Sequence, residues 1–195
     1  MRKSQSYYAF YEKEEPEEKI EPRVLSTYEW ASMMLISLIS VFLILGFAFR
    51  MVSVKGSSML PTLSPNNKLV VSNINDDYDY GDIVVVYEKD SHQEPIIKRV
   101  IAKGGDTISI DYDHGIVYLN GKELYEPYIN EPTHKRPAND IKFPITVPQG
   151  YVFLMGDNRN KSTDSRALSK GFIDQRNIYG KAYFRVFPFG YWGIY

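Results

Sequence analysis

Cysteine is absent from this sequence of 195 residues. Its absence excludes a disulfide framework, thiolate chemistry and any zinc site built on cysteine ligands. A strong net charge is also missing, since the chain carries −1 at pH 7. The composition therefore gives no electrostatic reason to expect a nucleic-acid partner.

Histidine is scarce, and its placement favours neither a metal site nor a catalytic triad. His92, His114 and His134 lie in polar, turn-like surroundings, and none has a second histidine at helix-face spacing. We therefore expect no metal and no cofactor. The G-x-S-x-G elbow, the S-x-x-K arrangement, the P-loop and G-x-G-x-x-G are missing as well. What remains as a candidate base is lysine.

One long stretch lacks charge altogether, residues 30–49, “WASMMLISLISVFLILGFAF”. A helix of this length is about 30 Å long, which is the thickness of the bilayer hydrocarbon core. A buried core helix is seldom so uniformly apolar. A cleaved secretory peptide usually has a shorter apolar region behind a short basic start, and a small-x-small site after it. We predict an uncleaved, single-pass anchor in the lipid bilayer over residues 29–50.

Residues 1–28 precede the anchor and contain the acidic run “EKEEPEEKIEP”. This run has no apolar periodicity and two prolines, so we predict a disordered tail. The tail carries more lysine and arginine than the 20 residues after the span. The positive-inside rule therefore favours a cytoplasmic N-terminus and places residues 51–195 on the extracellular side of the cell membrane.

Residues 51–195 have the composition of β-structure. Asn120-Gly121 is a hairpin signal, and the proline-rich residues 122–149 favour a long loop. No internal repeat is visible, and no segment after the anchor shows a strong helical apolar period. We predict a mainly β, extracytoplasmic domain on one N-terminal transmembrane helix. Short runs rich in valine, isoleucine and aromatics predict strands at 68–73, 82–88, 95–102, 106–112, 116–121, 151–156 and 177–187.

Lys98 lies inside one of these apolar runs, “PIIKRVIA”. If its side chain faces a dry interior, desolvation lowers its pKa, and the neutral amine can accept a proton from a serine hydroxyl. If the strand is an exposed edge, Lys98 and Arg99 instead protect that edge against aggregation. The segment by itself favours the exposed edge.

Two polar segments flank the predicted strands. “GSSMLPTL” (56–63) follows the anchor and offers two serines that are either turn residues or a nucleophile. “MGDNRNKSTDSR” (155–166) alternates carboxylates, guanidiniums and amides after an apolar strand. It is either a hydrogen-bonded platform that fixes neighbouring groups or a solvated loop whose ion pairs contribute little.

These segments together resemble one family. “GSSMLPTL”, “YGDIVVVY”, “IIKRVIAKGGD” and “MGDNRNKSTDSR” occur in the order, and at about the spacing, of the type I signal peptidases. The sequence resembles the short Gram-positive form, which has one N-terminal anchor and a compact catalytic domain. The resemblance implies a serine endopeptidase that removes signal peptides from exported preproteins, with no metal and no cofactor.

The resemblance also implies roles for individual residues. Ser58, which precedes Met-x-Pro, is the implied nucleophile, and Lys98 is the implied general base. Ser162 would hydrogen-bond the lysine amine, while Asp164 and Arg166 would pair to hold their loop. The signal peptide would pair as a strand with residues 53–57 and 95–98. Candidate pocket walls are Val54, Met59, Leu63, Ile96 and Ile97.

One departure concerns the oxyanion site. Many family members have a serine two residues before the nucleophile, whose hydroxyl helps to bind the oxyanion, whereas this chain has Gly56, as Gram-positive members often do. The oxyanion would then be bound at Gly56 and Ser58 by the Ser58 N–H and a second donor that the sequence does not identify. Ser57 does not match the nucleophile position of the motif.

Other functions remain open at this point. A catalytically silent homologue that binds precursors or assists pilus assembly is expected to lack the serine or the lysine. A self-cleaving Ser/Lys regulator has a soluble or DNA-binding partner domain in place of the anchor. A membrane-tethered ligand-binding domain leaves the pattern of Ser58, Lys98 and Ser162 unexplained. The sequence gives no oligomeric state.

Overall fold

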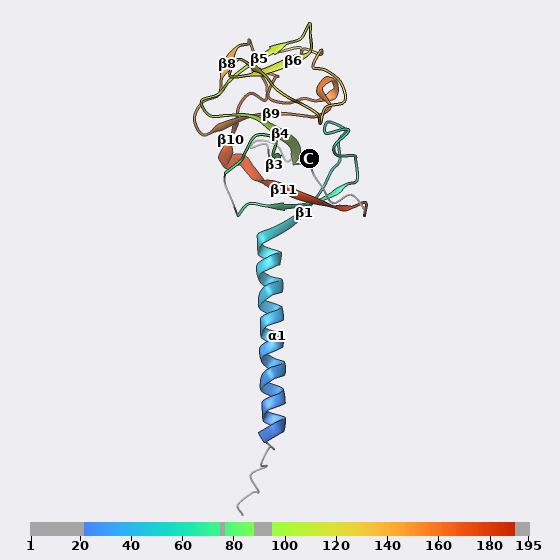
Figure 1. Cartoon of the computed structure of the whole chain (residues 1–195), viewed down its shortest axis with the longest axis vertical. Coiled ribbons are helices and arrows are strands. Elements are labelled where there is room, and N and C mark those ends of the chain that lie inside the picture. Colours follow the sequence, from blue (N-terminus) through green and yellow to red (C-terminus); the bar gives the residue numbers. More distant parts are fainter. Residues whose placement is uncertain (1–21, 75–76, 88–94, 190–195) are drawn as a thin grey trace, which may run out of the picture. The chain divides into compact units, whose positions relative to one another are not determined.

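The computed structural model describes residues 22–74, 77–87 and 95–189. Contacts divide the chain into two units, residues 1–44 and 45–195. Among the predicted features, residues 1–21 of the tail and His92 lie outside the described residues. The last part of the predicted disordered tail, residues 22–28, is helical instead. The first unit contains most of helix α1 (Pro22–Ala48) (Figure 1).

Helix α1 has the length and composition of a membrane span. Its segment Ser26–Ala48 has a mean hydropathy of 2.4, and its apolar side chains are exposed. The helix ends before the predicted anchor does, because Phe49 and Arg50 already belong to strand β1 (Phe49–Ser53). Phe49 pairs with Ser72 across this strand, which gives the end of the apolar run a β partner that the sequence alone does not reveal.

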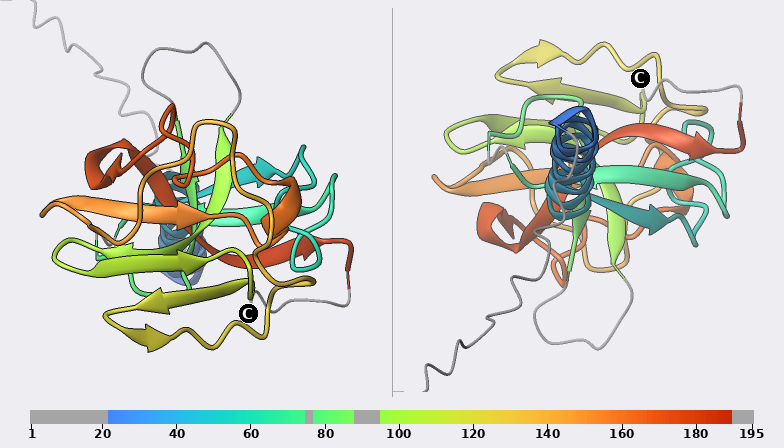
Figure 2. Two further views of the ribbon diagram at one scale, coloured as in Figure 1. Left: turned by 90° about the horizontal axis from the view of Figure 1, so that it is seen from above. Right: turned by 90° about the horizontal axis from the view of Figure 1, so that it is seen from below.

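The second unit is built of antiparallel strands in two sheets. A seven-stranded sheet has the order β1-β2-β11-β3-β4-β9-β10, and a four-stranded sheet has the order β7-β6-β5-β8. Figures 1 and 2 show β5, β6 and β8 as a separate layer beside the larger sheet. The remaining strands of the large sheet are β2 (Lys68–Ser72), β3 (Ile83–Val86), β4 (Ile96–Lys103), β9 (Tyr151–Met155), β10 (Ile173–Asp174) and β11 (Ile178–Phe187). The small sheet contains β5 (Thr107–Asp111), β6 (Ile116–Leu119), β7 (Lys122–Glu123) and β8 (Ile145–Thr146).

Each strand predicted from an apolar run is present, with ends that differ by up to two residues from the prediction. Asn120 and Gly121 have φ values of 52° and 76° and connect β6 to β7, as the hairpin signal predicts. Residues 122–149 are mostly irregular, with β7 and β8 near their two ends. The short strands β7, β8 and β10 were not predicted, because two residues carry too little pattern.

The centre of the large sheet is buried on both faces. Along β3 the side chains alternate between two clusters, with Ile83 and Val85 on one face and Val84 and Val86 on the other. A third cluster joins β4 and β9 to the small sheet through residues such as Ile101, Phe153 and Ile108. The middle strands are therefore rigid supports for the polar groups that they carry.

Candidate active site

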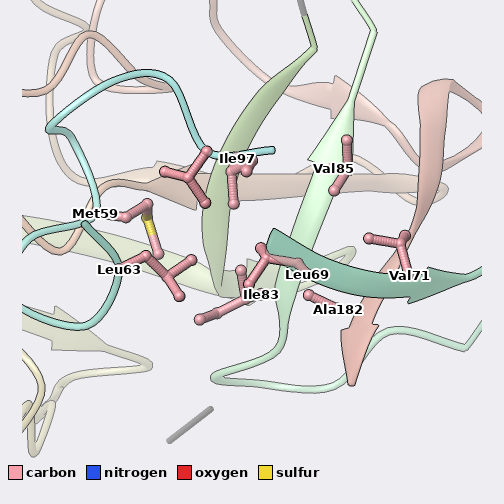
Figure 3. Close-up of a cluster of buried hydrophobic side chains, with 9 residues drawn as sticks. Met59, Leu63, Leu69, Val71, Ile83, Val85, Ile97 and Ala182 are labelled. Carbon is pink, nitrogen blue, oxygen red and sulfur yellow. The ribbon is translucent and has the colours of Figure 1, made fainter. Parts of the chain in front are cut away.

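The segment between β1 and β2 presents Ser58 on a loop that is anchored in the core. Met59 and Leu63, each 1% exposed, point into the apolar cluster around Ile83 and Ile97 (Figure 3). The Leu63 N–H donates to the Met59 carbonyl at 2.8 Å, which closes a helical turn. Burial of the residue after Ser58 fixes the backbone at that point. Ser57 is exposed and Ser58 is half-buried.

Lys98 lies in the middle of the large sheet. Strand β4 pairs with β3 on one side, where Lys98 faces Val84, and with β9 on the other, starting at Arg99 and Met155. The side chain of Lys98 is buried, with 4% of its surface exposed. The exposed-edge interpretation of this segment is therefore wrong. A period-two pattern cannot distinguish a central strand from an edge strand, because strand order depends on distant segments.

The amine of Lys98 and the hydroxyl of Ser58 are in direct contact. Lys98 Nζ donates to Ser58 Oγ at 2.8 Å and to the Ile97 carbonyl at 3.1 Å. Burial lowers the pKa of Lys98 below its usual value, and the negative charge of Asp164 opposes this shift only in part. A buried amine with a lowered pKa beside a serine hydroxyl is the arrangement that activates a nucleophile without histidine.

A pocket of about 180 Å³ adjoins this pair of residues. Gly56, Ser58 and Lys98 line this pocket. Four of the five predicted wall residues line it as well, namely Val54, Met59, Ile96 and Ile97. The fifth, Leu63, does not line the pocket. The turn that begins at Met59 directs the side chain of Leu63 into the core instead.

The loop after β9 is held by buried ion pairs. Arg166 donates from Nε and Nη2 to the two oxygens of Asp164 at 2.8 and 2.9 Å, and both side chains are almost fully buried. Burial alone would raise the pKa of Asp164, but the hydrogen bonds and charge of Arg166 outweigh it and hold the pKa below its usual value. The Gly156 N–H also donates to Asp164 at 3.0 Å. The segment is therefore a hydrogen-bonded platform.

Two further ion pairs were not identified from the sequence. Arg99, which follows Lys98, donates to both oxygens of Asp157 at 2.8 and 2.7 Å, and Thr62 donates to the same carboxylate at 2.5 Å. Arg159 forms a similar two-point pair with Glu126. The only sequence signal for them was the density of charge between residues 155 and 166. Asp157 thus connects β4 to the loop that carries Ser58.

Ser162 does not make the expected hydrogen bond to the lysine amine in this structure. Lys98 Nζ bonds Ser58 and Ile97, and Ser162 Oγ is buried without a hydrogen-bond partner among the described residues. Ser162 nevertheless lies close to the loop that carries Ser58. A β-carbon at Gly156 would overlap Ser162 Oγ and lie 2.5 Å from the Ser58 carbonyl oxygen.

Asn158 connects the platform to the loop that carries Ser58. Its backbone N–H donates to the Ser58 carbonyl at 2.9 Å, and its side-chain Nδ2 donates to the Ser57 carbonyl at 3.0 Å. The Ser58 N–H has no acceptor within the described part of the chain. At Gly56 a β-carbon would meet no atom within 4 Å, so space is open beside the serine.

No group of three or more potential metal ligands occurs within residues 22–74, 77–87 and 95–189. His114 pairs with Asp111 at an exposed position, and His134 is also exposed. Neither of these histidines is among the residues that line the pocket beside Ser58. The groups assembled here are therefore a serine, a lysine and a supporting set of carboxylates and guanidiniums.

The family model and the curated relatives that match this chain belong to one family. A family model described as “Signal peptidase, peptidase S26” matches residues 27–187. The chain is 35% identical to a signal peptidase I of Bacillus licheniformis over 181 residues, which cover 89% of this chain and 95% of that protein. It is 38% identical to a probable signal peptidase I-1 of Synechocystis sp. over 172 residues, 83% of each. A crystal structure of a signal peptidase I from Enterococcus faecalis aligns at 26% identity with a TM-score of 0.43, covering 54% of this chain and 96% of that chain.

Proposed function

The chain belongs to the signal peptidase I family of S26 serine peptidases, and we propose that Ser58 is its nucleophile and Lys98 its general base. The contact of 2.8 Å between Lys98 Nζ and Ser58 Oγ carries this proposal. The family removes signal peptides, and this activity requires a nucleophile beside a base within hydrogen-bond reach. The same contact argues against a catalytically silent homologue.

In the first half of the reaction, neutral Lys98 accepts the hydroxyl proton of Ser58 as Oγ attacks the carbonyl carbon of the last signal-peptide residue. The C–N bond then breaks, and the lysine ammonium returns the proton to the leaving amine of the mature protein. In the second half, Lys98 takes a proton from water, which attacks the acyl-enzyme. The ester C–O bond then breaks, the lysine ammonium returns the proton to Ser58 Oγ, and the signal peptide leaves as a carboxylic acid that ionises in water. The lysine must be neutral at the start of both halves, and its buried position supports this requirement.

Other residues of the site are proposed to bind the oxyanion and to hold Ser58 and Lys98 in place. The Ser58 N–H, with the open space at Gly56 beside it, is the proposed site for the oxyanion. Asp164 and Arg166 fix the loop that packs against Ser58. Ser162 is proposed to orient the Lys98 amine during the reaction, for which its nearby unpaired hydroxyl is suited.

The pocket beside Ser58 is consistent with a preprotein substrate that has small residues before the cleavage site. The pocket of about 180 Å³ is lined in part by the apolar side chains of Val54, Ile96 and Ile97, which suit apolar substrate side chains. The pairing of β4 with β9 begins only at Arg99. Residues 95–98 are therefore a suitable edge for an extended signal peptide on that side.

We further propose three parts for the chain: a cytoplasmic tail, a membrane anchor in the apolar segment Ser26–Ala48 of α1, and an extracytoplasmic peptidase domain that begins with β1. The apolar helix supports the anchor, and the excess of lysine and arginine before it supports the orientation. An anchor places enzyme and signal peptide at the same membrane surface, which raises their effective concentration.

Cleavage of a membrane-inserted preprotein by the detergent-purified full chain tests the proposal. Wild type, Ser58→Ala, Ser57→Ala and Lys98→Met are compared. We expect Ser57→Ala to retain cleavage and the other two variants to lose it. Cleavage by Ser58→Ala would refute the nucleophile assignment, and an inactive wild type would favour the precursor-binding or pilus-assembly role.

A further inference from the structure

We propose that Asn158 is a positioning residue for oxyanion binding: its side-chain amide holds the Ser57 carbonyl and thereby fixes the direction of the Ser58 N–H. The inference rests on the proposed function of Ser58. It assigns to Asn158 a role in the reaction that neither its loop position nor its residue type indicates.

The geometry consists of two hydrogen bonds on consecutive carbonyls. Asn158 Nδ2 donates to the Ser57 oxygen at 3.0 Å, and the Asn158 N–H donates to the Ser58 oxygen at 2.9 Å. The two peptide planes on either side of the Ser58 α-carbon are therefore both held from the same residue. The second bond belongs to the backbone and persists in any variant, whereas the first depends on the carboxamide.

Peptide planarity transmits the first bond to the oxyanion donor. The Ser57 carbonyl and the Ser58 N–H belong to one trans peptide unit, in which they point in opposite directions. A donor fixed on the oxygen therefore fixes the direction of the N–H on the other side. It also polarises the amide, which makes the N–H a stronger donor. Because the Ser58 N–H has no acceptor within the described residues, it is free to bind substrate.

The chain depends on this N–H because Gly56 has no hydroxyl to offer. A misdirected N–H would leave the developing negative charge with one donor fewer, and a single oxyanion donor is worth about 10²–10³ in kcat. The bond from Asn158 is exposed to solvent, so water can replace part of its effect when the side chain is removed. A carboxylate at this position would be worse than no side chain, since it repels the carbonyl oxygen.

The test compares Asn158→Ala, Asn158→Asp and a matched control, Asn160→Ala. Asn160 lies in the same loop, but its side chain binds Glu131 and the segment at 132–135 instead of the serine loop. The full chain in detergent is assayed for kcat, KM and pH dependence. Inhibition by a peptide aldehyde with small residues is also measured, because its hemiacetal with Ser58 needs the same N–H.

For Asn158→Ala we expect kcat to fall about 10-fold, and for Asn158→Asp about 100-fold, with KM nearly unchanged. Inhibition by the aldehyde should weaken in parallel with kcat/KM. In Asn158→Ala the acid limb of the pH profile should not move, since this substitution introduces no charge near Lys98. Asn160→Ala should retain kcat within about 3-fold.

Two results would overturn the inference. One is an Asn158→Asp variant with the kcat of the wild type, and the other is a fall in kcat that leaves the aldehyde affinity unchanged. If Asn158→Asp does not fold, the same criteria apply to Asn158→Ala. An inactive Ser58→Ala alongside a fully active Asn158→Asp refutes only this inference, whereas an active Ser58→Ala refutes the proposed function beneath it.

Discussion

Lys98 and Arg99 are neighbours in β4, yet Arg99 is paired with a carboxylate and Lys98 contacts uncharged groups. Arg99 donates to both oxygens of the Asp157 carboxylate, and its guanidinium lies 4.1 Å from the ring centroid of Tyr128. Lys98 instead contacts a neutral hydroxyl and a backbone carbonyl. One buried cation is thus matched by a carboxylate, while its neighbour is left in surroundings that favour loss of its proton.

Replacement of Lys98 by methionine should abolish cleavage and increase stability. The pKa of Lys98 is lowered from 10.5 in the folded state. Between that lowered value and 10.5 the unfolded chain binds a proton that the folded chain does not, so wild-type stability rises with pH by up to about 1.4 kcal/mol per pH unit. Methionine has no titratable group, so the variant lacks this contribution to the pH dependence of stability. The stability of Lys98→Met relative to the wild type should be highest at low pH, fall as pH rises from the lowered pKa, and stop changing above pH 10.5.

Denaturant unfolding of both proteins across pH 6–11 measures this difference. A Lys98→Met variant that is less stable than the wild type at neutral pH would contradict the account. A stability difference that does not change with pH would contradict it equally.

Replacement of Asp157 by asparagine should destabilise the fold by about 3–5 kcal/mol, because it leaves the buried Arg99 without a compensating charge. Cleavage should fall with it, since Asp157 also accepts from Thr62 in the serine loop. Thermal unfolding and the cleavage rate are the measurements. Asp79→Asn is the control, because its ion pair with Lys103 is exposed and should matter little. Equal effects of the two substitutions would show that burial of the pair is unimportant.

Replacement of Gly156 by alanine should inactivate the enzyme by displacing the serine loop. A β-carbon there overlaps Ser162 Oγ and lies 2.5 Å from the Ser58 carbonyl, which is backbone and cannot move alone. We expect kcat to fall by at least about 100-fold, since a shift of about 1 Å in a reacting group has this effect. Retention of wild-type kcat would mean that the close packing of Gly156, Ser162 and Ser58 is not needed for catalysis.

Replacement of Gly56 by serine should be tolerated and should raise kcat a few-fold. The β-carbon meets no atom within 4 Å, and the hydroxyl adds a donor beside the Ser58 N–H. Gly56→Ala is the matched control, since it adds the β-carbon without the hydroxyl. If Gly56→Ser and Gly56→Ala have the same kcat, the hydroxyl does not reach the oxyanion.

The sequence predicts those parts of the fold and site that depend on local pattern. The uninterrupted apolar run before Phe49 predicts the helix, and the valine-rich run at 82–88 predicts the strand observed at Ile83–Val86. The four motif blocks single out Ser58 and Lys98, which the structure brings into contact. Phe49 itself was misassigned, because an apolar residue at the end of a helical run fits a strand equally well.

Features that depend on distant segments were not predictable. Burial of Lys98 follows from the position of β4 between β3 and β9, which no local pattern specifies. The pairing of Arg159 with Glu126 joins residues 33 positions apart. The hydrogen bond from Asn158 to Ser57 spans 101 positions. Leu63 was predicted as a pocket wall because spacing along the chain does not show which way a turn directs its side chains.

The central claim is that Lys98 is neutral when it activates Ser58. The direct test is to titrate Lys98 in the full chain and to monitor the titration by NMR of the lysine side-chain carbons. The Lys98 signals are assigned by comparison with the spectrum of Lys98→Met. The account predicts a midpoint clearly below 10.5 that coincides with the acid limb of kcat/KM for preprotein cleavage. A midpoint at or above 10.5, or an acid limb unrelated to it, would contradict the account.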